Sequence, residues 1–105
     1  MMHMAPLELK ARLSSPDVPV MLDVREPWEL QTASIENSTH IPMRELSARM
    51  AELDPDMEIV VICHHGSRSL QVAHFLERSG FDRVYNLTGG VDAWARTVDP
   101  SMPVY

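Results

Sequence analysis

The chain has 105 residues, of which 45% are hydrophobic and 23% are charged, and its formal net charge is −6. We expect one compact domain over residues 1–105, because this length is too short for two. The acidic balance argues against nucleic acid as a partner and against an anionic membrane surface. One cysteine cannot form an internal disulfide, and no apolar run is long enough to span a membrane. We therefore expect a soluble, cytoplasmic protein.

Turn signals and apolar periodicity divide the chain into alternating helices and strands. In chain order, the expected elements are helix 6–14, strand 20–24, helix 26–30, strand 40–41, helix 43–53, strand 58–63, helix 69–79, strand 84–87 and helix 91–96. Residues 98–105 are expected to form a tail. Strands that alternate with helices favour an α/β fold, in which helices cover both faces of a parallel sheet.

Three chemically distinct segments lie at the carboxyl ends of predicted strands: residues 23–25, residues 63–68 and residues 87–90. Ligands of parallel sheets bind beyond the carboxyl ends of the strands. We therefore expect these segments to meet at one rim of the sheet and to form the functional site there.

The only cysteine, Cys63, follows the buried strand Glu58–Ile62 and precedes a helix. A strand, a tight loop and a helix in this order place the sulfur at the helix N-terminus, among backbone N–H groups without helical partners. These groups favour the thiolate, which is the nucleophilic form of cysteine. Gly66 allows the loop to curl without a clash at Cβ. An inert buried thiol is the common alternative, and the partly exposed setting that we expect here argues against it.

Three segments together resemble the rhodanese-like domains. They are Leu22–Glu29 (LDVREPWE), Cys63–Ser69 (CHHGSRS) and Asn86–Trp94 (NLTGGVDAW). Their order and spacing resemble a single-domain rhodanese over nearly the whole chain. The resemblance implies a three-layer α/β/α sandwich with a five-stranded parallel sheet. It also implies a sulfurtransferase of the thiosulfate:cyanide type, which works through a cysteine persulfide.

Carried over residue by residue, the resemblance makes Cys63 the sulfur carrier. The loop that would bind the substrate, largely through its backbone amides, consists of His64, His65, Gly66, Ser67, Arg68 and Ser69. The second helix of these domains is usually followed by Gly-His-Ile-Pro-Gly-Ala, which reads ASIENS at residues 33–38 here. We expect this departure to affect the local loop and the rim beside the site, although Asn37 is able to take a left-handed backbone conformation.

The charged residues beside the loop have more than one interpretation. Arg68 either binds the substrate anion or forms a structural ion pair with Asp23, because an arginine fork serves both purposes. Asp23 is expected to brace the loop rather than to act as an acid or base. Arg25 is expected to face the acceptor or the rim, with a surface salt bridge to Glu26 or Glu29 as the alternative.

His64 and His65 are expected to shape the loop rather than to act as a general base or as metal ligands. An ionised thiolate needs no base, and a persulfide needs no metal. Adjacent histidines chelate poorly, and a zinc site would need more ligands close by. We therefore expect no metal and no cofactor.

Two other functions stay open. A cysteine phosphatase or arsenate reductase can share this fold, but five residues separate cysteine and arginine in those phosphatases, whereas four separate Cys63 from Arg68. The shorter loop suits a sulfur atom better than a tetrahedral oxyanion. The other alternative is a sulfur-carrier or interaction module with protein partners.

The donor and the acceptor follow from the single cysteine. Because no second cysteine resolves the persulfide, its sulfur must pass to an outside acceptor. We expect thiosulfate or a related sulfane-sulfur compound as the donor, and cyanide or a small or protein thiol as the acceptor.

Overall fold

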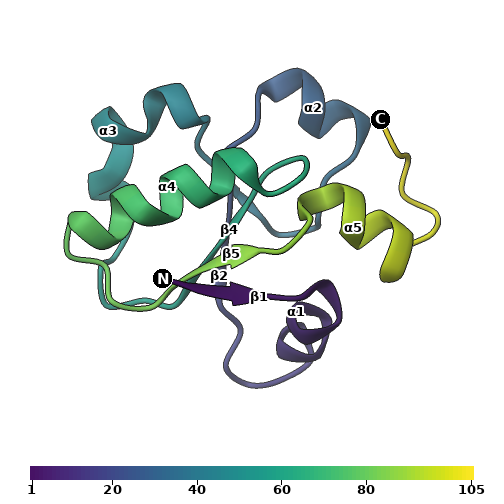
Figure 1. Ribbon diagram of the computed structural model, residues 1–105, viewed down its shortest axis with the longest axis horizontal. Helices are drawn as coiled ribbons and strands as arrows, with labels where there is room; N and C mark the ends of the chain where they lie inside the picture. Colours follow the sequence, from purple (N-terminus) through teal and green to yellow (C-terminus); the bar gives the residue numbers. More distant parts are fainter.

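The computed structural model describes all 105 residues and contains one sheet of five parallel strands (Figure 1). The strands are β1 (Met2–Met4), β2 (Val20–Asp23), β3 (Thr39–His40), β4 (Ile59–Ile62) and β5 (Val84–Leu87). Their order across the sheet is β1-β5-β4-β2-β3, so β4 lies in the middle. Val61 of β4 is paired in register with Leu22 of β2 on one side and with Asn86 of β5 on the other.

Helices connect the strands and cover both faces of the sheet (Figure 1). Their bounds are α1 (Pro6–Leu13), α2 (Pro27–Thr32), α3 (Leu46–Arg49), α4 (Ser67–Arg78) and α5 (Gly90–Thr97). Two 3₁₀ turns flank α3, namely η1 (Met43–Glu45) and η2 (Met50–Glu52). No helix combines the length and the apolar character that a membrane span requires.

The two faces of the sheet carry separate apolar cores, because side chains alternate along each strand. In β4, Ile59 and Val61 belong to the core beneath α3 and α4. Val60 and Ile62 point to the opposite face and pack with residues of α1 and α5. All four side chains are completely buried. The expected three-layer α/β/α sandwich with a five-stranded parallel sheet is thereby confirmed.

Besides shifts of one or two residues at other element ends, three details differ from the prediction. Strand β1 was missed, because three residues show no clear alternation and the strand is defined by its pairing with β5. The helix predicted over residues 43–53 is broken into η1, α3 and η2, whose outer parts form tighter 3₁₀ turns. Helix α4 begins at Ser67 rather than at residue 69, because Gly66 takes a left-handed conformation and forms its N-cap.

Candidate active site around Cys63

The carboxyl ends of β2, β4 and β5 meet around one loop, residues 63–69, as the sequence predicted. The loop follows β4 and leads into α4. In the first turn of α5, the backbone N–H groups of Val91 and Asp92 donate to the carbonyl oxygens of Cys63 (2.8 Å) and His64 (3.0 Å). Only Thr88 and Gly89 separate β5 from α5. These hydrogen bonds therefore hold the loop against the end of the neighbouring strand.

Gly90 makes this close contact between α5 and the loop possible. A Cβ atom at this position would lie 2.4 Å from the carbonyl oxygen of Cys63 and 2.5 Å from that of His64. The φ angle of Gly90 is +61°, in the left-handed region that favours glycine. Any side chain here would push the loop away from α5.

The Cys63 sulfur lies at the N-terminus of α4. The backbone N–H of Gly66, the N-cap residue, donates to Sγ at 3.0 Å. The hydroxyl oxygen of Ser69 lies 3.3 Å from the same sulfur. The N–H dipole and the helix dipole both stabilise negative charge at this point.

Two expectations about the loop are corrected. Cys63 is only 1% exposed, so the sulfur is enclosed rather than partly exposed. Of the backbone amides from His64 to Arg68, only that of Gly66 donates a hydrogen bond to the sulfur. His65 and Ser67 are exposed on the loop.

Asn86, near the end of β5, orients the two groups that contact the sulfur. The Ser69 hydroxyl donates to Oδ1 of Asn86, and Nδ2 of Asn86 donates to the carbonyl oxygen of Gly66 at 3.3 Å. Asn86 belongs to the third family-like segment, but its role could not be predicted from the sequence, because its contacts depend on the position of β5 beside the loop.

Arg68 forms a two-pronged ion pair with Glu29 of α2, at 2.7 Å from Nη1 to Oε1 and 2.9 Å from Nη2 to Oε2. This corrects the predicted pairing with Asp23. Hydrogen bonds from Arg68 lower the pKa of Glu29 to about 2, although burial of the carboxylate opposes this. An arginine has five N–H donors, so three donors of Arg68 are left for an anion.

Arg25 is completely buried, which overturns both the expected place at the rim and the surface salt bridge. Its guanidinium donates to the carboxylate of Asp23, with Nη2 at 2.7 Å, and to the carbonyl oxygen of Ala33 at 2.8 Å. Asp23 also accepts a hydrogen bond from the backbone N–H of Arg25 at 3.1 Å. Asp23 therefore braces this region through Arg25 and not through Arg68.

His64 and His65 stack on each other, with ring centroids 3.8 Å apart and an angle of 32° between the planes. Burial, followed by repulsion from His65, lowers the pKa of His64, which favours the neutral ring at pH 7. Together with Asp92, the two histidines bring three possible ligand atoms within 4.8 Å of one another. The Asp92 carboxylate is paired with Arg96 at 3.0 Å.

Tyr105 reaches the site from the segment after α5. Its hydroxyl accepts a hydrogen bond from Nη1 of Arg25 and donates one to Oε2 of Glu29, each at 2.7 Å. Its ring is stacked on His64, with centroids 3.8 Å apart and planes at 3°. This role of the tail could not be predicted from the sequence, because no local pattern marks a contact between residues 76 positions apart.

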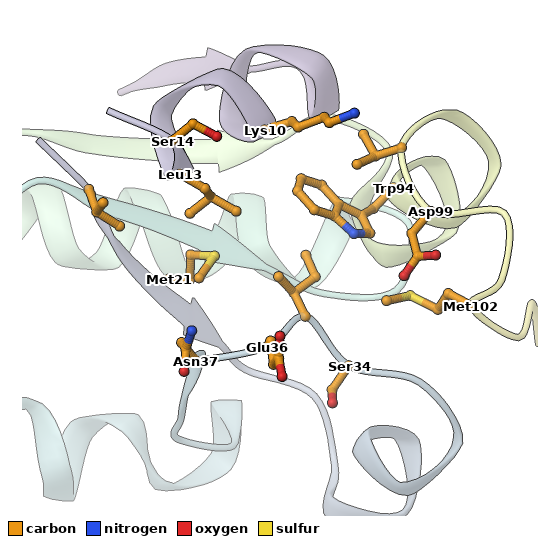
Figure 2. A pocket seen from close by; sticks show the side chains of 13 residues that line it. Lys10, Leu13, Ser14, Met21, Ser34, Glu36, Asn37, Trp94, Asp99 and Met102 are labelled. Carbon is orange, nitrogen blue, oxygen red and sulfur yellow. The ribbon is translucent and has the colours of Figure 1, made fainter. Parts of the chain in front are cut away.

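The largest cavity of the molecule, about 640 Å³, lies elsewhere and contains none of the predicted site residues. Figure 2 shows its lining, with Trp94 and Met102 on one side and residues of segment 34–37 on another. This segment is part of the stretch that departs from the family pattern, and Asn37 takes the left-handed conformation expected of it, with φ +66°. The departure therefore shapes this cavity on the α1 and α5 side of the sheet, away from the sulfur.

The chain is similar in sequence to several known proteins. The Rhodanese-like domain family model matches residues 5–97. The chain is 36% identical over 88 residues to a sulfurtransferase of Allochromatium vinosum, a match that covers 84% of this chain and 82% of the relative. It is 38% identical over 105 residues to the chloroplastic Rhodanese-like/PpiC domain-containing protein 12 of Arabidopsis thaliana, where it covers 93% of this chain but spans only 35% of the relative.

A solved structure shows the same fold. The crystal structure of a rhodanese-related protein from Thermoplasma volcanium superimposes with a TM-score of 0.83 at 32% sequence identity. The match covers 100% of this chain and 98% of that protein.

Proposed function

The chain belongs to the family of rhodanese-like domains, and we propose that it is a sulfurtransferase that carries sulfur as a persulfide on Cys63. The observation that carries this proposal is the hydrogen bond from the Gly66 N–H to the Cys63 sulfur at the N-terminus of α4. A thiolate in this position is a stabilised nucleophile. The name of the Allochromatium vinosum relative, a sulfurtransferase, points to the same class of reaction.

The proposed reaction has two steps. The Cys63 thiolate attacks the outer sulfur of thiosulfate, a new S–S bond forms, and sulfite leaves with the electron pair of the broken S–S bond. Cyanide or an acceptor thiolate then attacks the outer sulfur of the persulfide, and Cys63 returns as the thiolate. Charge and electrons balance in each step without a cofactor, and no proton has to be removed from an ionised thiol.

The groups around the sulfur fit the charge that this reaction carries. Negative charge stays on or near the sulfur through both steps, where the Gly66 N–H and the start of α4 stabilise it. The Ser69 hydroxyl lies 3.3 Å from the sulfur and donates its one proton to Asn86, so it donates to the charged sulfur only by turning away from Asn86. The loop residues His64, His65 and Ser67 form the surroundings that an incoming donor meets.

Arg68 is proposed to serve both functions that the sequence left open. Its ion pair with Glu29 braces the loop, and its three remaining N–H donors attract the sulfonate group of thiosulfate. Asp23 and Arg25 support this arrangement from the interior. They contact no solvent and are not proposed to meet the substrate.

The presence of a single cysteine determines how the persulfide is discharged. Because the chain holds no second thiol, an outside acceptor must discharge the persulfide. We propose cyanide as the test acceptor and a small or protein thiol as the natural one. Reduced thiols abound in the cytoplasm, which is the compartment that we propose for this step.

Thiocyanate formation from thiosulfate and cyanide tests the proposal in solution. We expect turnover by the wild-type protein and none above background with Cys63→Ser, because a serine hydroxyl forms no persulfide. Circular dichroism should show that the variant is folded. Activity of the variant close to that of the wild type would contradict the role of Cys63.

A sulfur carrier that exchanges sulfur with partner proteins is the second candidate. Trp28 favours it, because this large apolar side chain is 62% exposed and its ring meets that of Tyr105 beside the site. A carrier would turn over thiosulfate slowly and accept sulfur rapidly from a persulfidated protein. A phosphatase is disfavoured, because four residues separate Cys63 from Arg68, whereas five separate cysteine and arginine in those enzymes.

A further inference from the structure

The enclosed sulfur of Cys63 raises the question of how a donor reaches it. At 1% exposure, Cys63 has almost no surface that a thiosulfate sulfur could approach. Attack requires the two sulfur atoms to come into contact along the new bond. A group near the loop must therefore move before the reaction.

Tyr105 lies beside the active-site loop, against His64 and Glu29. Its ring is stacked on His64, the first residue after Cys63. Its hydroxyl donates to the Glu29 carboxylate that holds Arg68, at the other end of the loop. Tyr105 therefore contacts one end of the loop directly and is linked to the other end through Glu29.

The segment that carries Tyr105 is weakly attached elsewhere. After α5, the last backbone hydrogen bond runs from the N–H of Met102 to the carbonyl oxygen of Asp99. Residues 103–105, here called the strap, form no backbone–backbone hydrogen bond, and Val104 is 50% exposed. Figure 1 shows this end of the chain running from α5 back to α2. The strap is therefore held at Tyr105, through its side chain and through its backbone, which lies beside His64.

The Tyr105 hydroxyl fixes the strap through two hydrogen bonds to charged groups. It accepts from the Arg25 guanidinium and donates to the Glu29 carboxylate, so both of its hydrogen bonds involve a charged partner. Burial is the main cause that raises its pKa to about 12, and the bond to Glu29 adds to this. The hydroxyl therefore stays protonated throughout the neutral pH range, and its hydrogen bonds keep the strap in place there.

We propose that residues 103–105 form a strap over the active-site loop, that Tyr105 is its latch, and that reagents reach Cys63 when the strap opens. Release frees the face of His64 on which the Tyr105 ring is stacked, and it removes one hydrogen bond from Glu29, the partner of Arg68. The identity of the sulfur donor rests on the proposed function, whereas the opening itself does not.

Alkylation of Cys63 by iodoacetamide tests the strap without any sulfur transfer. Tyr105→Phe keeps the ring but removes both hydrogen bonds, and we expect about tenfold faster alkylation, which corresponds to about 1.4 kcal/mol. Tyr105→Ala also removes the stacking and is expected to react faster still. Tyr85→Phe removes the only other tyrosine hydroxyl, away from the loop, and should react like the wild type. Equal rates for wild type, Tyr105→Phe and Tyr105→Ala would overturn the proposal.

Two further measurements distinguish opening of the strap from other causes of faster alkylation. Opening should raise the alkylation rate at every pH and leave the pH midpoint of the reaction in place, whereas a change in thiolate stability would move that midpoint and count against the strap. Urea unfolding of each variant shows whether global unfolding accounts for the faster reaction, which would also count against it. Faster alkylation without persulfide formation from thiosulfate would support the strap while contradicting the proposed donor.

Discussion

Replacing Glu29 by glutamine should reveal how strongly the ion pair with Arg68 stabilises the folded protein. Glutamine keeps the shape of the side chain but removes the negative charge. The side chain of Glu29 is 4% exposed, and its carboxylate accepts hydrogen bonds from both Nη1 and Nη2 of Arg68. The substitution therefore leaves the Arg68 cation without its partner.

The size of the effect follows from the pKa of Glu29. This pKa lies at about 2 in the folded protein, compared with 4.5 ordinarily. The difference corresponds to about 3 kcal/mol of free energy of unfolding, at about 1.4 kcal/mol for each pKa unit. The side chain of Arg68 is 34% exposed, so water screens the pair, and we expect a loss of about 2 kcal/mol at pH 7.

The same pKa gives the loss a defined dependence on pH. A carboxyl group whose pKa is lowered by folding contributes its full stability above pH 4.5 and loses it as the pH falls towards 2. The difference between wild type and Glu29→Gln should therefore be constant from pH 5 to pH 7. It should fall by about half between pH 5 and pH 3.

Urea unfolding followed by circular dichroism measures this difference at each pH. Glu52→Gln is the matched control, because Glu52 pairs with Arg49 on the exposed surface, where water screens the interaction. We expect a much smaller loss for the control. A Glu29→Gln loss no larger than that of the control, or one that does not change between pH 5 and pH 3, would refute the reasoning.

The remaining predictions concern the loop. Arg68→Ala should raise the thiosulfate concentration for half-saturation about tenfold, as expected for the loss of a charged hydrogen-bond donor, and an unchanged value in a folded variant would leave Arg68 a brace only. Gly90→Ala should abolish transfer, because its Cβ would lie 2.4 Å from the carbonyl oxygen of Cys63. Gly80→Ala is its control, since it has a similar left-handed backbone but nothing within 4 Å of its Cβ, and it should cost stability of about 1 to 2 kcal/mol without loss of activity. Equal activities of the two glycine variants would contradict the steric argument.

The centre of the site was predictable because its signals are local. A run of buried β-branched residues before Cys63 indicates a strand, and the amphipathic pattern after Arg68 indicates a helix. The sulfur therefore had to lie near a helix N-terminus. Gly66 could likewise be chosen from the chain alone, because a tight turn between these elements favours a glycine.

The partners of Arg68 and Arg25 were not predictable in this way. Asp23, Glu26 and Glu29 lie within one short segment and carry the same charge, so the sequence does not distinguish them as partners. The structure distinguishes them by position. Asp23 points inward with Arg25, whereas Glu29 lies on α2 opposite the start of α4.

Other features depend on contacts between distant parts of the chain. Strand β1 is three residues long and is defined by its hydrogen bonds to β5. Tyr105 contacts Glu29 across 76 positions, and Asn86 reaches Ser69 and Gly66 only because β5 lies beside the loop. The burial of Cys63 arises in the same way and was therefore expected wrongly.

The most direct test of persulfide formation on Cys63 is the intact mass of the reduced protein after incubation with thiosulfate and again after addition of cyanide. The proposed reaction predicts a gain of one sulfur atom that cyanide removes and that Cys63→Ser does not acquire. The cyanide step is essential, because oxidation to a sulfinic acid adds two oxygen atoms of nearly the same mass and is not reversed by cyanide. No gain in mass, or a gain that survives cyanide, would contradict a persulfide formed from thiosulfate.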